Sequence, residues 1–385
     1  MRLSVRIPWI EPGVYQLPEV CPHSDCDGHF FKPHQNGCPK LVRDPKHEMV
    51  EAQRWRCLKC GRTFRLYPKG VGQSQQTEAL KAVSVLFYVL GLSYGGVSDA
   101  LTALGWFLSK STVYRNVQAA GQRVRALRSA RSESTPVLGV DTTQVRCAGE
   151  QVTLAVAVNG LKGVTVSLEC LDSENAEEVE AWLKELAAAL GVEVLISDDA
   201  DAYKTVADKL GLEHQVCRAH VNRNVARLVG TLAEKALNSP DPVPQGLDVT
   251  PEQLIEDLEY LQTEIALRPL DGAQKMGQLH ERYQAAPPPA EGEKASMWYR
   301  MRLLTLDWWN NWQRLTLDKR WRGAQGESLD GTNNVSERAI GWWIKDRYRT
   351  MRGYKRQESV LNVSHLTTWL GAHSGDYGLA ELMAA

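Results

Sequence analysis

Residues 136–171, PVLGVDTTQVRCAGEQVTLAVAVNGLKGVTVSLECL, decide the fold class of this chain. The segment holds three runs that are rich in β-branched and aliphatic residues, and turn signals separate the runs. Such runs are typical of strands. We therefore predict three successive strands that pair as an antiparallel meander.

The sequence that follows alternates between helical and strand patterns. Residues 172–191 predict an amphipathic helix with Asp172 or Ser173 as its N-cap. Residues 192–200, VEVLISDDA, predict a buried strand that ends in acidic residues, and 201–211 predict a second helix before a short strand at 212–217. Three strands, a helix, a strand, a helix and a strand form the order of a ribonuclease H-like α/β fold.

Changes of composition divide the rest of the chain. A Cys- and His-rich segment runs to about Pro68, KGVGQSQQ follows as a linker, and three helices are predicted from Thr77 to about Arg131. Residues 218–330 read as mostly helical with Pro-rich breaks, which is too long for a loop. The predicted parts are a zinc-ribbon domain at 1–70, a helix-turn-helix domain at 71–133, the ribonuclease H-like domain at 134–217 and 331–385, and an all-helical insertion at 218–330.

Overall composition is that of an ordinary globular protein. The 385 residues are 43% hydrophobic and 24% charged, and no apolar run reaches about 18 residues, so no membrane span is expected. The first residues lack the apolar core of a signal peptide, which indicates the cytoplasm. In that compartment eight cysteines favour metal ligands or buried thiols over disulfides.

Charge is unevenly distributed along the chain, although the net charge is only −1. Residues 1–135 carry 19 basic and 10 acidic side chains, residues 136–337 carry 19 and 32, and residues 338–385 carry 7 and 4. The ends are therefore basic and the middle is acidic. An acidic middle repels phosphate unless bound cations bridge the two, which bound metals can do.

Two cysteine pairs near the N-terminus have the spacing of zinc ligands. Cys21 and Cys26 form one pair, and Cys57 and Cys60 form the other in the sequence CLKCG. Four thiolates on two tight turns can surround one structural Zn²⁺, so we predict a zinc ribbon. Unrelated buried thiols are the alternative. The first pair has an unusually wide spacing, which leaves open that a nearby side chain replaces one ligand: His23, His29, His34 or Cys38.

Basic residues around the second cysteine pair and in the helical trio suggest contacts to double-stranded DNA. LSKSTVYRNVQAAG resembles the second helix of a helix-turn-helix that begins near Ser109, whose first side chains would reach base edges in the major groove. A solvated basic face and a helical trio that binds nothing are the alternatives. The predicted DNA contacts here are Arg54, Arg56, Lys59, Arg62, Lys110, Thr112 and Arg115.

Acidic side chains follow two of the predicted strands. Asp141 ends the first strand and Asp198 follows the fourth, and these strands are neighbours in a ribonuclease H-like sheet. Two close carboxylates repel each other unless a cation separates them, and hard oxygen ligands suit Mg²⁺. Asp199 and Asp201 compete with Asp198 for the second position, although Asp201 is better placed to cap the next helix.

Glu337 lies in GTNNVSERAIGWWIKDRYRTMRGYKR, residues 331–356, ahead of seven basic residues. NVSE from Asn334 has the pattern of a capping box, which would use Glu337 for a purely structural role. A third metal ligand beside a DNA backbone is the other interpretation, and the missing partner for the two Asp residues favours it. The basic residues expected to contact phosphates are Arg338, Lys345, Arg347, Arg349, Arg352, Lys355 and Arg356.

The motifs GVDTT, ISDDADAY, CRAH and TNNVSERAIG together resemble the DDE transposases of bacterial insertion sequences. In pattern they are similar to the Mutator-type and hAT-type superfamilies, whose members share a Cys-x-x-His after the fifth strand. The resemblance implies a catalytic triad of Asp141, Asp198 and Glu337 that holds two Mg²⁺ or Mn²⁺ ions. It also implies that Cys217 and His220 form a structural clasp near the site and not a zinc site, since two ligands alone cannot complete tetrahedral zinc. The helical insertion would separate the second Asp from the Glu.

The same resemblance implies a function. A transposase would bind the terminal inverted repeats of its element and carry out metal-dependent DNA cleavage and strand transfer, as a homodimer or larger assembly on DNA. Late tryptophans are usually core residues, but Trp308, Trp309 or Trp312 could stack on a flipped base. The alternatives are a nuclease of the same fold without strand transfer and a domesticated relative that only binds DNA.

Overall fold

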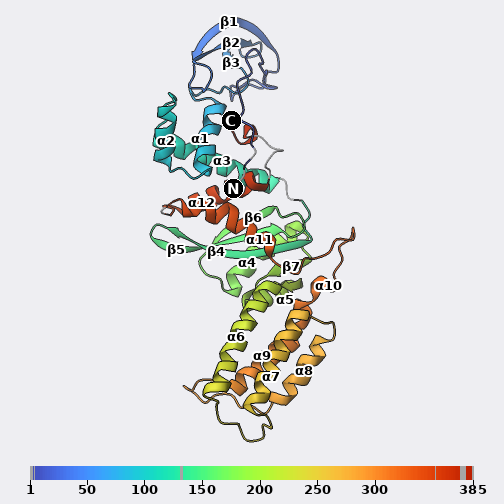
Figure 1. The fold of residues 1–385 in the computed structure, drawn as a ribbon. Helices are drawn as coiled ribbons and strands as arrows, with labels where there is room; N and C mark the ends of the chain where they lie inside the picture. The colour runs from blue at the N-terminus through green and yellow to red at the C-terminus, as the bar shows by residue number, and fades with distance from the viewer. Residues whose placement is uncertain (1–2, 4, 131–132, 352, 373–378, 384–385) are drawn as a thin grey trace. The chain divides into compact units, whose positions relative to one another are not determined.

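The computed structural model describes residues 3, 5–130, 133–351, 353–372 and 379–383 (Figure 1). The chain divides into two compact units. The first unit comprises Met1–Arg131, Gln144–Val152 and Ala339–Ala385, and the second comprises Ser132–Thr143 and Thr153–Arg338. The predicted segment 331–385 is thus shared between the units at Arg338, and the domain limits given above remain predictions.

The first unit begins with a small antiparallel sheet in the order β1-β2-β3. Its strands are β1 Phe31–Leu41, β2 Met49–Cys57 and β3 Thr63–Leu66. The hydrophobic cluster beside them is small and consists of Ile10, Val42 and Val50, with Val71 packed against it. So little buried apolar surface stabilises an isolated sheet weakly, and such domains usually depend on another constraint.

Three helices follow, as the sequence predicts: α1 Glu78–Val89, α2 Tyr94–Ala103 and α3 Lys110–Ala130. Thr77 and Ser93 cap the first two by accepting hydrogen bonds from the backbone N–H groups of Leu80 and Gly96. The C-terminal helical elements of this unit are η1 Ala339–Lys345, α12 Asp346–Arg349, α13 Gln357–Ala372 and α14 Ala380–Met383. Helix α13 packs closely along α3, because a Cβ on Gly121 would lie 2.3 Å from the carbonyl oxygen of Asn362.

A five-stranded mixed sheet in the order β6-β5-β4-β7-β8 lies in the second unit, apart from the β4–β5 hairpin residues Gln144–Val152, which belong to the first. Its strands are β4 Val137–Cys147, β5 Glu150–Asn159, β6 Thr165–Leu171, β7 Val194–Ser197 and β8 Glu213–Val216. Strand β6 pairs antiparallel with β5, whereas β7 is parallel to both β4 and β8. The adjacency of β4, β5 and β6 and the pairing of β4 with β7 are as predicted for a ribonuclease H-like sheet.

Helices α4 Ala176–Leu190 and α5 Asp201–Leu210 complete the predicted alternation of strands and helices. The predicted cap of α4 is wrong: Asn175 is the N-cap and accepts from the N–H of Glu178, whose carboxylate accepts in turn from the N–H groups of Asp172 and Ser173. Helix α4 begins at Ala176 because the Asn175 side chain accepts from the N–H of Glu178, which would otherwise be unpaired at the helix start. Asp201 is the first residue of α5 and not its cap, which is Ala200.

The insertion forms a helical bundle with its own core. Its elements are α6 Arg218–Asn238, α7 Pro251–Leu267, α8 Gly272–Tyr283, α9 Met297–Leu315 and α10 Leu317–Arg320, and α11 Asn334–Arg338 follows. The core consists of aliphatic side chains with the buried Trp298, Trp308 and Trp312. In the described part of the chain, no helix combines the length and the apolar character that crossing a membrane requires.

Candidate functional site

Two neighbouring parallel strands bring Asp141 and Asp198 together beside the carboxyl end of β7. The prediction that Asp141 ends its own strand is wrong, because β4 continues to Cys147. Gly139 of β4 pairs with Ile196 of β7, and each Asp lies two residues beyond that pair. Because parallel strands keep their register, the two carboxylates leave the sheet side by side. The sequence prediction that these strands are neighbours is confirmed.

The electrostatics of Asp141 show which charges surround it. Burial raises the pKa of Asp141 to about 6, the N–H of Thr142 opposes this, and the carboxylates of Asp198 and Glu337 raise it further while His220 lowers it. Such effects require short separations. Asp141, Asp198, Glu337 and His220 therefore form one cluster, which we call the acidic cluster.

Glu337 reaches the cluster from α11. This helix begins at Asn334, one residue earlier than a capping box headed by Asn334 needs, so Glu337 is the fourth helical residue and not the third, and the capping interpretation is wrong. Instead, Oε1 of Glu337 lies 3.5 Å from Nδ1 of His220. Gly139 allows α11 to approach the sheet, because a Cβ there would lie 2.8 Å from the Ser336 hydroxyl oxygen.

The segment before α11 is hydrogen-bonded to the sheet and to α6. The Asn333 amide donates to the carbonyl of Val140 at 2.7 Å, and its backbone N–H donates to Sγ of Cys217 at 3.3 Å. The N–H of Arg218 donates to the carbonyl of Gly331, and the N–H of Cys217 to that of Ser197. These bonds fix the carboxylate of Glu337 relative to the ends of β4 and β7.

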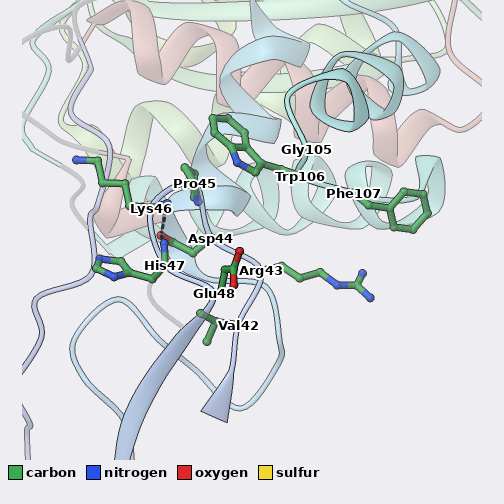
Figure 2. A pocket seen from close by; sticks show the side chains of 10 residues that line it. All are labelled: Val42, Arg43, Asp44, Pro45, Lys46, His47, Glu48, Gly105, Trp106 and Phe107. Carbon is green, nitrogen blue, oxygen red and sulfur yellow. Dashed lines mark hydrogen bonds between the residues drawn. The ribbon is translucent and has the colours of Figure 1, made fainter. Parts of the chain in front are cut away.

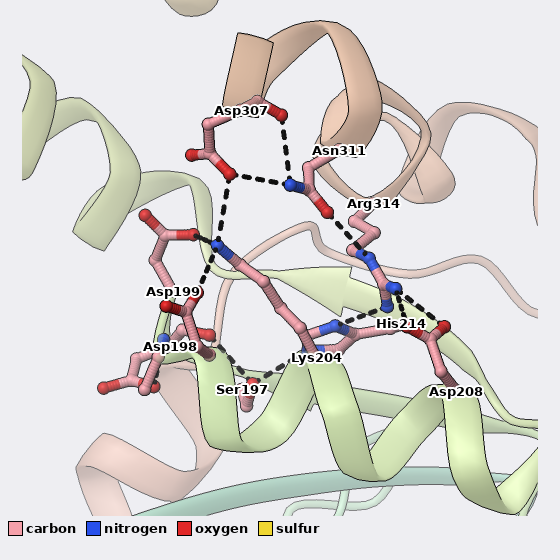
Figure 3. A network of polar contacts seen from close by, with 11 residues as sticks. Ser197, Asp198, Asp199, Lys204, Asp208, His214, Asp307, Asn311 and Arg314 are labelled. Carbon is pink, nitrogen blue, oxygen red and sulfur yellow. Dashed lines mark hydrogen bonds and ion pairs between the residues drawn. The ribbon is translucent and has the colours of Figure 1, made fainter. Parts of the chain in front are cut away.

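The rival acids Asp199 and Asp201 have a different partner. Lys204 of α5 forms ion pairs with Asp199 at 2.9 Å and with Asp201 at 3.3 Å, and lies 3.8 Å from Asp307 of α9 (Figure 3). Asp199 is thereby neutralised by a side chain that is only 11% exposed. Among the acidic residues at 198, 199 and 201, Asp198 is therefore the one whose charge raises the pKa of Asp141.

A second hydrogen-bonded chain connects the insertion to the backbone of Asp198 (Figure 3). Arg314 of α9 lies 3.1 Å from Nδ1 of His214, and Nε2 of His214 lies 2.8 Å from the Ser197 hydroxyl, which donates to the carbonyl of Asp198. Because Arg314 can only donate, Nδ1 must accept and Nε2 carries the proton. Arg314 also forms two bonds of 2.7 Å with Asp208.

The buried His214 predicts an acid-sensitive fold. Burial is the largest cause that lowers the pKa of His214 to about 3, and the positive charges of Arg314 and Lys204 lower it further. A free His has a pKa of about 6.5. The unfolded chain therefore takes up the proton first as pH falls, and the stabilisation present above pH 6.5 is lost toward pH 3. We expect this group to reduce the unfolding free energy by roughly 1.4 kcal/mol per pH unit below about pH 6.

The variant His214→Asn tests this prediction. It should be less stable at neutral pH, and its unfolding free energy, measured by urea titration between about pH 4 and 6.5, should fall less steeply as the pH is lowered. An equal pH dependence in the two proteins would contradict the assignment.

The four predicted zinc ligands converge in the first unit. Sγ of Cys21 lies 3.9 Å from that of Cys60, and Sγ of Cys26 lies 3.8 Å from that of Cys57. Thiolates bound to one zinc at about 2.3 Å in a tetrahedron lie about 3.8 Å apart, so the set fits the ion. Within the described residues this sulfur cluster contains none of the four possible substitutes: His23, His29, His34 and Cys38.

Most of the predicted DNA-contacting side chains are accessible. Arg54 and Thr112 are partly buried, and the exposed ones are Arg56, Lys59, Arg62, Lys110, Arg115, Arg338, Lys345, Arg349, Lys355 and Arg356. Lys59 and Arg62 form ion pairs with Asp27 and Asp25, which reduces the positive charge they offer. Arg352 lies outside the described residues.

Arg347 is the exception, and its predicted phosphate contact is wrong. Its side chain is 2% exposed, lies 4.0 Å from the ring centroid of Tyr88, and donates to the Leu92 carbonyl and the Thr350 hydroxyl. These bonds offset part of the cost of burying the guanidinium, whose Nε has no hydrogen-bond partner among the described residues. The residue therefore connects α12 to the α1–α2 turn.

Arg347→Ala should accordingly destabilise the protein by roughly 2–4 kcal/mol, because it removes the donor to the Leu92 carbonyl and the Thr350 hydroxyl and the contact with Tyr88. Arg349→Ala is the matched control, since the Arg349 side chain is 73% exposed. Thermal unfolding should show a lower midpoint for Arg347→Ala alone. Equal midpoints for the two variants would mean that Arg347 has no structural role.

Of the three tryptophans considered for base stacking, two are excluded by burial. Trp308 and Trp312 are 1% and 2% exposed and belong to the core of the insertion. Trp309 is 43% exposed, and its ring centroid lies 5.7 Å from that of His280. Trp309 is therefore the one of the three with a face available to a ligand.

A surface cavity of about 450 Å³ lies in the first unit and was not predicted (Figure 2). Its lining comes from residues 42–48 and from 105–107. Arg43 lines it together with a second hollow of about 290 Å³ that includes Thr112 and Arg115. Arg43 is thus a further cation beside the start of α3, which sequence spacing alone did not indicate. No member of the acidic cluster lines either hollow.

Comparison with known proteins identifies the family. The sequence pattern described as Transposase IS66 family matches residues 73–347. Among curated proteins, none matches the chain. Among solved structures, the chain is similar to the catalytic core domain of BIV integrase at 14% identity and a TM-score of 0.19, over 51% of this chain and 91% of that one. The HTLV-2 integrase catalytic core domain in complex with magnesium matches at 17% identity and a TM-score of 0.20, over 28% and 78%. The family match spans most of the chain and confirms the transposase resemblance: the protein belongs to the IS66 transposase family.

Proposed function

We propose that this protein is a DNA transposase that cleaves the ends of its own element and joins them to target DNA. The acidic cluster carries this proposal, because it gathers carboxylates from three separate segments at one edge of the sheet. A fold alone does not establish a function, whereas a cluster of mutually repelling acids needs a chemical explanation.

Asp141, Asp198 and Glu337 are the residues that would hold the metal. The fit rests on the raised pKa of Asp141, since burial and two neighbouring carboxylates penalise its negative charge and a divalent cation would relieve that repulsion. Carboxylate oxygens are the ligands that Mg²⁺ and Mn²⁺ prefer. Two such ions, when bound, would activate the attacking oxygen and stabilise the leaving 3′-oxygen.

The chain's own residues would position the reacting phosphate. In cleavage, water attacks the phosphorus, the bond to the 3′-oxygen breaks, and a 3′-hydroxyl is released. In joining, that hydroxyl attacks a target phosphodiester and displaces a second 3′-oxygen. Neither step needs a covalent protein intermediate. The Lys204 ion pairs and the His214 chain would keep the end of β7 and Asp198 in place throughout.

The basic first unit is the proposed DNA-binding part. Arg115 and Lys110 lie at the exposed start of α3, and Arg43 adds a cation beside them. The four-cysteine cluster would hold one structural zinc ion and orient the small sheet. Trp309 is the proposed stacking residue for an unpaired base. Because two element ends must be joined, we expect a homodimer or larger assembly on DNA.

A strand-transfer assay tests the proposed activity. Purified protein is incubated with Mg²⁺, pre-cleaved element-end DNA and a target plasmid. The proposal predicts plasmids joined to the end DNA. Nicking of end DNA without joined products would show a nuclease instead, and binding without either product would show a relative that only binds DNA.

A further inference from the structure

A second group of metal-ligand side chains lies beside the acidic cluster. The ligand atoms of Cys217, His220 and Glu337 all lie within 4.8 Å of one another. Cys217 is the N-cap of α6, His220 lies in the first turn of that helix, and Glu337 comes from α11. A thiol, an imidazole and a carboxylate are the donor types of zinc and not those of magnesium.

The separations agree with a single small ion. Nδ1 of His220 lies 3.5 Å from Oε1 of Glu337. Two ligand atoms at about 2.0–2.1 Å from one zinc ion lie roughly 3.4 Å apart at the tetrahedral angle. The cluster therefore needs only small movements to accept zinc.

The surroundings of the three ligands favour metal binding over simple packing. Cys217 is fully buried, and the N–H of Asn333 donates to its sulfur, as a supporting hydrogen bond to a bound thiolate would. Nδ1 of His220 is a buried atom that makes no hydrogen bond among the described residues, and it faces the Glu337 carboxylate. Nδ1 is thus positioned to bind a cation together with the Glu337 carboxylate.

We propose that Cys217, His220 and Glu337 form a zinc-binding site with an open fourth position, distinct from the four-cysteine cluster. The rival explanation is a plain ion pair between His220 and Glu337, in which Cys217 would only pack and accept the hydrogen bond from Asn333. Zinc binding needs no transposition activity, so this inference can fail while the proposed function stands, and the reverse also holds. If Glu337 is also a magnesium ligand, zinc at this site would compete with magnesium for it.

Zinc stoichiometry of the full-length chain tests the site. The protein is equilibrated at about 1 µM free zinc in a metal buffer, and bound zinc is measured by atomic emission. We expect two ions for the unaltered chain and one for His220→Gln and for Cys217→Ser. Cys170→Ser, a change in β6 outside both clusters, should keep two. One ion in the unaltered chain, or two in both ligand variants, would overturn the proposal.

Cobalt spectra add a readout that does not depend on counting ions. In the double variant Cys57→Ser, Cys60→Ser, the remaining Co²⁺ site should still show thiolate charge transfer, because Cys217 supplies a sulfur ligand. Adding Cys217→Ser should remove that band while His220→Gln weakens Co²⁺ affinity at least about tenfold. If the double variant is folded and shows no thiolate band, the assignment is contradicted.

Discussion

Asp141→Asn is expected to lower DNA cleavage and strand transfer at least about a thousandfold while DNA binding is retained. The amide has nearly the same shape as the carboxylate, but it lacks the charge that would hold a divalent ion between Asp141 and its two acidic neighbours. Binding should persist because the basic side chains of the first unit remain. Product formation and gel-shift affinity on the same end DNA measure the two effects separately.

Asp201→Asn is the matched control for this experiment. Asp201 follows the same strand, and its side chain is 96% exposed at the start of α5. We expect its cleavage rate to stay within a few-fold of the unaltered protein. Should Asp141→Asn cleave as fast as the Asp201→Asn control, the carboxylates would have no part in the chemistry.

Cys57→Ser is expected to unfold the small sheet of the first unit. The hydrophobic cluster beside that sheet has three buried residues among those described, so a bound zinc would supply most of its stability. Structural zinc binding contributes on the order of 10 kcal/mol in small domains. Cys57 is fully buried beside Gly28, where a Cβ would lie 2.8 Å from its sulfur. The measurement is limited proteolysis of residues 31–66, with and without a zinc chelator.

Cys38→Ala is the control for the zinc prediction. Cys38 lies in β1 and is buried, but it does not belong to the four-sulfur cluster. Its loss should cost about 1–2 kcal/mol and leave the sheet protected from protease. Equal protease sensitivity of the Cys57 and Cys38 variants would indicate that the sheet does not depend on metal.

Local sequence patterns were sufficient to predict the central sheet, because alternating and apolar runs determine strands and their ends. The placement of Asp141 beside Asp198 followed from that strand order. The interactions of Lys204 and His214 could not be predicted, since their partners Asp307 and Arg314 lie about a hundred residues away along the chain. Only the folded insertion brings α9 to the end of β7.

Sequence predictions are wrong at positions where one local pattern is compatible with two structures. NVSE matches a capping box, but hydrogen bonds from Asn333 to Val140 and Cys217 determine where α11 begins. Arg347 belongs to a basic run and reads as a surface cation, yet Tyr88 and the Leu92 carbonyl bury it. Trp308 and Trp309 are adjacent in sequence, and only the helix face separates a core residue from an exposed one.

We propose that the carboxylates of Asp141, Asp198 and Glu337 bind divalent cations in one shared site. Anomalous diffraction from crystals of the protein with element-end DNA and Mn²⁺ tests it most directly. We expect manganese peaks about 2.2 Å from carboxylate oxygens of Asp141 and Asp198, with Glu337 in the same ligand set. Manganese bound at Asp199 and Asp307, with the Asp141 carboxylate free of metal, would contradict it.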